Sequence, residues 1–126
     1  MDPRRFWGVI FLAAACTCSG VQAQESVRLL VQNSPLAGFR YHAAAGVWRE
    51  LRVGDRLELA REPRNPHDPN AVAVLWQGQK LGYVPRRENA ALAWGLDRGT
   101  QLRARISALA AHPNPARRVR FDVYVE

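Results

Sequence analysis

Alternating polar and apolar residues divide most of this chain into short segments that favour β-strands. Arg56–Arg61 alternates with a period of two, which is typical of a strand with one buried face. Ala71–Trp76 is more continuously apolar, as a central strand would be, and Gln77–Gln79 has the composition of a tight turn. Lys80–Val84 follows that turn directly, so the two apolar segments are expected to pair as a hairpin. Three further segments carry a strand pattern: Val27–Gln32, Leu102–Ile106 and Val119–Val125.

One segment between the strands has a helical pattern instead. Arg87–Leu96 is rich in Ala and Leu and predicts a short amphipathic helix that stops before Gly99. Six strands, one helix and Gly- and Pro-rich turns predict a mainly β fold, a small closed or partly open β-barrel of about six strands. The residues expected in its core are Val72, Val74, Leu81, Val84, Leu92, Ile106, Phe121 and Val123. Three tryptophans are expected to pack in or beside this core: Trp48, Trp76 and Trp94.

The first 23 residues have the layout of a secretory signal peptide. Met1–Arg5 is net positive, Phe6–Ala15 is apolar, and Val21–Ala23 fits a cleavage site with small residues. The apolar run is far shorter than the roughly 20 residues that a membrane-spanning helix needs. We therefore expect a signal peptide over 1–23, a domain over 24–126 with no transmembrane segment, and a periplasmic or secreted location. A buried or frayed N-terminal helix is the alternative interpretation.

Both cysteines, Cys16 and Cys18, lie inside this leader. The mature chain would then have no disulfide, and cysteine usage gives no separate evidence about its redox compartment. Cys16 follows Ala13–Ala15, so a lipoprotein attached through Cys16 is a minor alternative. Ala rather than Leu three residues before the cysteine weakens that alternative.

The chain is basic, with a formal net charge of +7. This charge favours polyanionic partners, but Lys80 is the only lysine among 18 basic residues, a bias that often reflects genome composition. Arg117, Arg118 and Arg120 form either a solvated basic face or an extension of a nucleic-acid backbone track. Charge alone therefore does not decide the partner.

No motif of the sequence predicts catalysis, a metal or a cofactor. The histidines His42, His67 and His112 do not have metal-ligand spacing, and a structural zinc site needs about four ligands. Phosphate-loop, nucleophile-elbow and His-Glu-x-x-His motifs are absent from the sequence. His67 precedes Asp68, but neighbours on a proline-rich loop rarely converge on one substrate atom. We expect a binding module rather than an enzyme.

The most informative segment lies between the second and third predicted strands. Arg61–Asn70 contains three prolines alternating with Asn, His and Asp, which fix the backbone and favour Asx turns. With Gly38–Tyr41, the following Ala71–Val74, Gly82–Pro85 and the short Glu88–Ala93 helix segment, it resembles the HIRAN domain family from about Leu36 to Val125. This family is known from helicase-like remodellers and from stand-alone bacterial domains. Hydrolase and zinc activities of the remodellers belong to helicase and RING portions that this sequence lacks.

The resemblance implies an OB-like barrel that captures the 3′ end of single-stranded DNA. By resemblance, the binding residues are Arg40, Tyr41, His67, Asp68, Tyr83 and Arg86. Asp68 matches an acidic residue that accepts a hydrogen bond from the terminal 3′-hydroxyl, and its charge would repel an internal phosphate. Tyr41 and Tyr83 would stack bases, while Arg40 and Arg86 would neutralise phosphates. Departures from the family pattern occur at His67, where Tyr is frequent, and at Tyr83, where well-studied members have His.

Plainer interpretations of these residues stay open. Tyr41 and Tyr83 could pack at the barrel rim, and Asp68 and Asn70 could only cap the loop. An exported domain would meet little chromosomal DNA, and fold does not fix function. The alternative function is therefore an exported envelope binding module for a protein or an anionic polymer.

Overall fold

The computed structural model describes residues 28–125, and these form one antiparallel sheet with short helices. Its strands are β1 (Leu29–Pro35), β2 (Arg56–Arg61), β3 (Val72–Trp76), β4 (Gln79–Tyr83), β5 (Leu102–Leu109) and β6 (Val119–Val125). The α-helices are α1 (Ala44–Val47) and α2 (Ala90–Asp97), and the 3-10 turns are η1 (Phe39–Tyr41), η2 (Trp48–Glu50), η3 (Arg86–Glu88) and η4 (Pro115–Arg117). The strand order is β1-β6-β5-β2-β3-β4. The mainly β prediction with six strands is confirmed.

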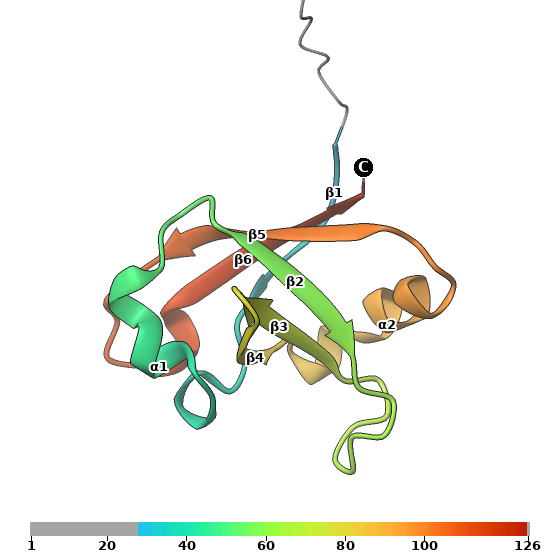
Figure 1. Cartoon of the computed structure of the whole chain (residues 1–126), viewed down its shortest axis with the longest axis horizontal. Coiled ribbons are helices and arrows are strands. Elements are labelled where there is room, and N and C mark those ends of the chain that lie inside the picture. Colours follow the sequence, from blue (N-terminus) through green and yellow to red (C-terminus); the bar gives the residue numbers. More distant parts are fainter. Residues whose placement is uncertain (1–27, 126) are drawn as a thin grey trace, which may run out of the picture.

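Strand β2 joins the two halves of the sheet. Its first residues, Arg56 and Leu57, pair with β5, whereas Glu58–Arg61 pairs with β3. Figure 1 shows β2 crossing from the β5–β6 side of the molecule toward β3 and β4, with α2 beside the far end. This change of partner within one strand lets the sheet bend around a core, as in OB-like folds.

The predicted core is confirmed. Alternation along β6 buries Val119, Phe121 and Val123 and leaves Arg120 exposed, while β3 is buried along most of its length. All eight residues predicted to lie in the core are buried: Val72, Val74, Leu81, Val84, Leu92, Ile106, Phe121 and Val123. Because β3 lies between β2 and β4, its continuous apolar run matches its central position.

The sheet is not closed into a barrel. The edge strand β4 meets the segment after the other edge strand, β1, through an isolated bridge between Tyr83, the last residue of β4, and Ala37. Each amide of this pair donates to the other carbonyl at 2.9 Å. Gly82, next to Tyr83, allows this approach, because a Cβ atom there would overlap the Ala37 carbonyl oxygen. The OB-like prediction is therefore confirmed, in its partly open form.

Two local expectations were wrong. Helix α2 corresponds to the one predicted helix, but α1 and the 3-10 turns were not anticipated. Trp76 is buried and Trp48 packs against the core, whereas Trp94 is 63% exposed on α2 with the Arg98 guanidinium stacked 3.9 Å from its ring centroid. Burial on α2 is instead supplied by Leu92 and Ala93.

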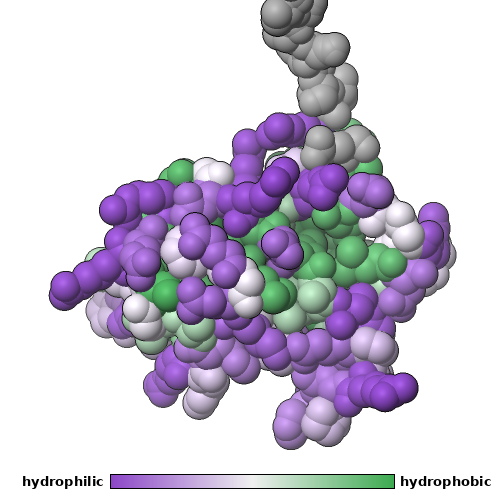
Figure 2. Space-filling model, viewed as in Figure 1, coloured by the Kyte–Doolittle hydropathy of each residue, from purple (hydrophilic) through white to green (hydrophobic). Residues whose placement is uncertain are grey.

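The predicted signal peptide over 1–23 lies outside the described residues, as do Cys16 and Cys18. Among residues 28–125, no helix is both long and apolar enough to cross a membrane. The loop between β2 and β3 projects at the lower right of Figure 1. In the same view, Figure 2 shows this projection as hydrophilic, in contrast to the hydrophobic area in the middle of the face.

Candidate functional site

A hollow of about 320 Å³ lies between the β2–β3 loop, the end of β4 and the segment after β1. We call it the loop pocket. Its lining residues are Ala37, His42, Asn65, His67, Asp68, Ala71, Tyr83, Val84 and Arg86. Four residues predicted from the sequence thus meet here: His67, Asp68, Tyr83 and Arg86.

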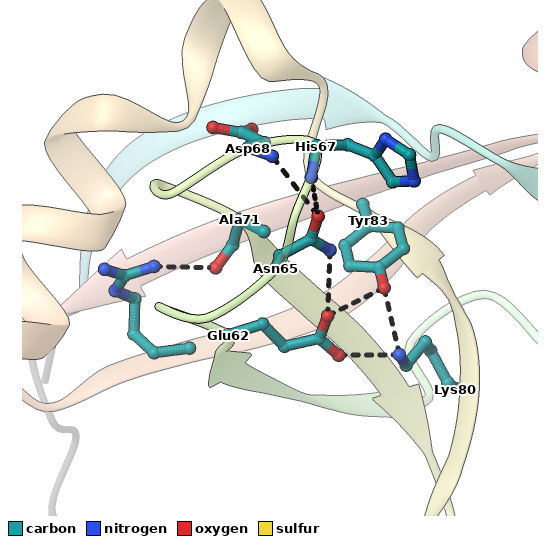
Figure 3. A network of polar contacts seen from close by, with 8 residues as sticks. Glu62, Asn65, His67, Asp68, Ala71, Lys80 and Tyr83 are labelled. Carbon is teal, nitrogen blue, oxygen red and sulfur yellow. Dashed lines mark hydrogen bonds and ion pairs between the residues drawn. The ribbon is translucent and has the colours of Figure 1, made fainter.

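Asn65 holds the loop in shape from within. Its side-chain oxygen accepts hydrogen bonds from the amides of His67 at 2.8 Å and Asp68 at 3.2 Å, an Asx-type turn. Its side-chain nitrogen donates to Glu62 Oε1 at 3.1 Å, as Figure 3 shows. The prolines restrict φ, and these bonds close the turn, so the loop loses little further entropy on binding a ligand.

Arg61, the last residue of β2, fastens the same loop from outside. Its guanidinium donates to the carbonyls of Ala71 at 2.9 Å and Pro69 at 3.1 Å. It also forms an ion pair with Asp97 of α2 at 2.9 Å. The loop is therefore anchored at its exit and connected to the helix.

The Asp68 carboxylate is oriented by two donors. Oδ1 accepts from the Asn70 amide at 2.9 Å, and Oδ2 accepts from the buried side chain of Asn89 at 2.7 Å. Desolvation raises the pKa of Asp68, but these two hydrogen bonds and the charges of Arg86 and Arg61 outweigh it and lower the pKa below its usual value. Asp68 is thus a fixed negative charge at neutral pH. Its two oxygens offer about four lone-pair sites, so a ligand hydroxyl can still donate to it.

A second network fixes Tyr83. Its hydroxyl donates to Glu62 Oε1 at 2.8 Å and accepts from Lys80 Nζ at 2.9 Å, and Lys80 pairs with Glu62 Oε2 at 2.6 Å. Figure 3 shows Glu62 at the centre, where it also receives the Asn65 amide. Desolvation raises the pKa of Glu62, but hydrogen bonds from Lys80, Tyr83 and Asn65 lower it overall. The hydrogen bond to Glu62 raises the pKa of Lys80. The tyrosine hydroxyl is therefore occupied, and its ring is held in place.

Arg40 and Tyr41 do not line the loop pocket. Gly38 has a left-handed conformation (φ 78°), and the η1 turn that follows buries Phe39 while leaving Arg40 and Tyr41 exposed. They line a separate hollow of about 180 Å³ that also contains Asn114 and Pro115. The six residues predicted as a site thus divide between two neighbouring hollows on either side of one loop.

Sequence reasoning missed part of the lining. His42 stands next to Tyr83, with ring centroids 5.2 Å apart and rings nearly perpendicular. Its position directly after Tyr41 in the Gly38–Tyr41 motif was the available signal. Glu62 and Lys80, which are partly exposed, and the buried Asn89 support the lining residues through hydrogen bonds, and no separate signal in the sequence indicated this role. Among residues 28–125, no group of three His, Cys, Asp or Glu side chains could hold a metal ion.

The HIRAN domain family model matches residues 29–126, most of the chain. The chain belongs to the HIRAN domain family. HIRAN domains are known as nucleic-acid-binding modules.

Three known proteins are similar to this chain. A Fanconi-associated nuclease 1 homolog from Oryza sativa subsp. japonica is 34% identical over 90 residues, 68% of this chain. The chain spans only 9% of that nuclease's length. A solved Lactobacillus plantarum protein is 27% identical with a TM-score of 0.68, covering 79% of this chain and 95% of that one. The HIRAN domain of human HLTF shares the fold, at 24% identity, a TM-score of 0.62 and 78% coverage of each chain.

Proposed function

We propose that the loop pocket captures the 3′ end of a single strand of DNA and that the domain acts by binding rather than by catalysis. The observation that carries this proposal is the oriented, ionised Asp68 beside Arg86 in one hollow. A carboxylate with free lone pairs attracts a terminal hydroxyl and repels a phosphate at the same place. Arg86 can neutralise the phosphate of the preceding linkage.

The aromatic residues would supply sequence-independent stacking. Tyr83 is held by Glu62 and Lys80, so its ring can meet a base without losing conformational freedom. Tyr41 is 77% exposed beside Arg40, whose guanidinium carbon lies 5.9 Å from its ring centroid. Tyr41 would therefore stack a base outside the loop pocket, across the segment that separates the two hollows.

The geometry of His67 and Asp68, which are neighbours in the sequence, agrees with a non-catalytic role. The Asp68 carboxylate is bonded to Asn70 and Asn89, and its hydrogen bonds with the loop do not involve the His67 imidazole. In the described residues, the Asp68 carboxylate thus accepts from two amide groups and does not orient the His67 imidazole, as the carboxylate of a catalytic dyad would. Nuclease activity of the larger plant relative is not transferred to this chain.

The end-capture proposal is tested by fluorescence anisotropy with matched oligonucleotides ending in a 3′-hydroxyl or a 3′-phosphate. We expect the wild type to prefer the hydroxyl. Asp68→Asn should reduce the preference more than the affinity, because it removes the repulsion together with the acceptor charge. Tyr41→Ala should weaken both ligands alike, by about 1–3 kcal/mol, the value of one base stack.

Equal affinity of the wild type for both ends would exclude end capture. If no oligonucleotide bound even at low salt, where phosphate contacts are strongest, the exported module for a protein or an anionic polymer would be the better proposal. Glu58→Gln is a suitable control for Asp68→Asn, because it removes one negative charge from an exposed position on β2 outside the loop pocket.

We also propose that the domain is exported after cleavage between Ala23 and Gln24, as the leader pattern predicts. Intact-mass measurement of protein from the native host checks this. A cytoplasmic species that retains Met1–Ala23 would contradict the proposal. A species processed at Cys16 with added lipid mass would support the lipoprotein alternative.

A further inference from the structure

A hollow of about 480 Å³ beside the loop pocket is lined by arginines and by no acidic residue. We call it the arginine groove. Its lining residues are Pro35, Arg87, Asn114, Ala116, Arg117 and Arg120. They come from the end of β1, from η3, from the β5–β6 loop with η4, and from β6. Three positive charges on separate elements therefore face one hollow without a carboxylate among its walls.

The three arginines are available to a ligand. None of them forms an ion pair with a carboxylate of the described chain. Arg120 is oriented by the side chain of Asn33, to which its Nε donates at 2.8 Å, and this neutral partner leaves its charge uncompensated. Arg87, in the middle of η3, and Arg117, at the end of η4, are both exposed. Holding three like charges together is unfavourable in the free protein, and an anion in the groove would relieve that repulsion.

The wall formed by the β5–β6 loop is held in shape by its own contacts. The Asn114 side chain accepts from the Ala116 amide at 3.0 Å and caps η4. Arg118 donates to the carbonyls of His112 at 2.7 Å and Pro113 at 3.4 Å, and its guanidinium carbon lies 5.2 Å from the Phe39 ring centroid. Arg118 thus stabilises the loop, and Arg117 beside it remains free to contact a ligand.

The arginine groove adjoins both hollows that contain the predicted site. Arg86 lines the loop pocket and Arg87 lines the groove, and consecutive Cα atoms are about 3.8 Å apart. On its other side, the groove shares Asn114 and Ala116 with the hollow that contains Arg40 and Tyr41. A strand that ends in the loop pocket can therefore continue over η3 into the groove without leaving the protein surface.

We propose that the arginine groove binds backbone phosphates of the same DNA strand, on the 5′ side of the end captured in the loop pocket. This inference rests on the proposed function, which supplies the strand. Guanidinium groups match phosphate geometry, and the groove contains no aromatic side chain on which a base could stack. The side-chain oxygen of Asn114, its one amide side chain, already accepts a hydrogen bond from the Ala116 amide. Contacts there are therefore with the backbone and independent of sequence.

The test compares a three-nucleotide with a twelve-nucleotide oligothymidylate, both with a 3′-hydroxyl, by anisotropy at several salt concentrations. The variant is Arg87→Gln with Arg117→Gln, since neither side chain has a hydrogen-bond or ion-pair partner in the described structure. The control is Arg49→Gln with Arg56→Gln, which removes the same charge from exposed positions outside these three hollows. Circular dichroism melting verifies that both proteins fold.

We expect the groove variant to bind the long oligonucleotide on the order of tenfold more weakly than the control does at 0.1 M salt. Its salt slope should be shallower by about 1.4, since each lost single-strand phosphate contact removes about 0.7. Binding of the short oligonucleotide should match the control. Equal long-oligonucleotide affinity and slope in variant and control would overturn the groove while leaving end capture intact. A groove variant that loses affinity for the long oligonucleotide, together with a wild type that binds 3′-hydroxyl and 3′-phosphate ends equally, would support the groove and reject end capture. A wild type that bound neither length would reject both.

Discussion

Val74→Asp should unfold the domain or bring it to the edge of unfolding. Val74 is fully buried in β3, opposite Leu59 of β2 on one side and Gly82 of β4 on the other. A carboxylate placed there would have no partner among the apolar side chains of the core, and burying it costs several kcal/mol. A domain of this size has a total stability of only about 5–15 kcal/mol, so most of it would be lost. Thermal melting followed by circular dichroism measures the effect.

Val74→Ala is the matched control, because it removes volume at the same site without adding charge. It should cost less than Val74→Asp and leave a cooperative melting transition. A Val74→Asp protein that melted with the wild type would mean that Val74 is not in the core. The pairing of β3 with its two neighbours would then be wrong as well.

Strand positions could be predicted from the sequence wherever one face of a strand is buried. β2 and β6 have the expected bounds, because buried and exposed residues alternate along the first part of β2 and along most of β6. β1 begins and ends later than expected, since the side chains at its start, Leu29 and Leu30, are exposed and carry little pattern information. β5 extends to Leu109 through an irregularity after Ile106 that breaks the alternation.

Helix α1 could not be predicted, because tertiary contacts rather than sequence signals stabilise it. It is four residues long, contains Gly46, and has no side-chain cap at Ala43. An isolated helix of this length is unstable in water. Here the Ala43 amide donates to the Lys80 carbonyl at 2.9 Å, and Ala44 and Val47 are buried against the core.

The grouping of the site residues was only partly predictable for a related reason. The proline-rich loop places His67 and Asp68 by local rules, and the hairpin brings Tyr83 and Arg86 to them. The division of Arg40 and Tyr41 from this group depends on the left-handed Gly38 and on burial of Phe39, which sequence spacing does not reveal. The sequence indicated part of the arginine groove, because Arg117 and Arg120 belong to one basic segment. That Arg87 of η3 joins them depends on tertiary packing, which no local pattern shows.

Gly82→Ala should damage the fold and the loop pocket together. The added Cβ atom would overlap the Ala37 carbonyl oxygen, and this neighbour is backbone, which cannot rotate away. Ala37 would have to move, breaking the two 2.9 Å hydrogen bonds that form its bridge with Tyr83. Overpacking costs about 1–3 kcal/mol and each of the two lost hydrogen bonds about 0.5–1.5 kcal/mol, so we expect a loss of about 2–6 kcal/mol in unfolding free energy. Denaturant unfolding measures this loss.

Gly46→Ala is the matched control, because a Cβ atom there meets nothing within 4 Å. It lies inside α1, where Ala is favoured over Gly by roughly 0.5–1 kcal/mol, so this variant should be as stable as the wild type or slightly more stable. Gly82→Ala also tests whether the bridge between Ala37 and Tyr83 supports the loop pocket. Ala37 and His42 line the loop pocket opposite Tyr83, so Gly82→Ala should weaken binding of a 3′-hydroxyl oligonucleotide under conditions in which it is still folded. Unchanged stability and unchanged binding in Gly82→Ala would show that the bridge between β4 and the segment after β1 does not hold the pocket together.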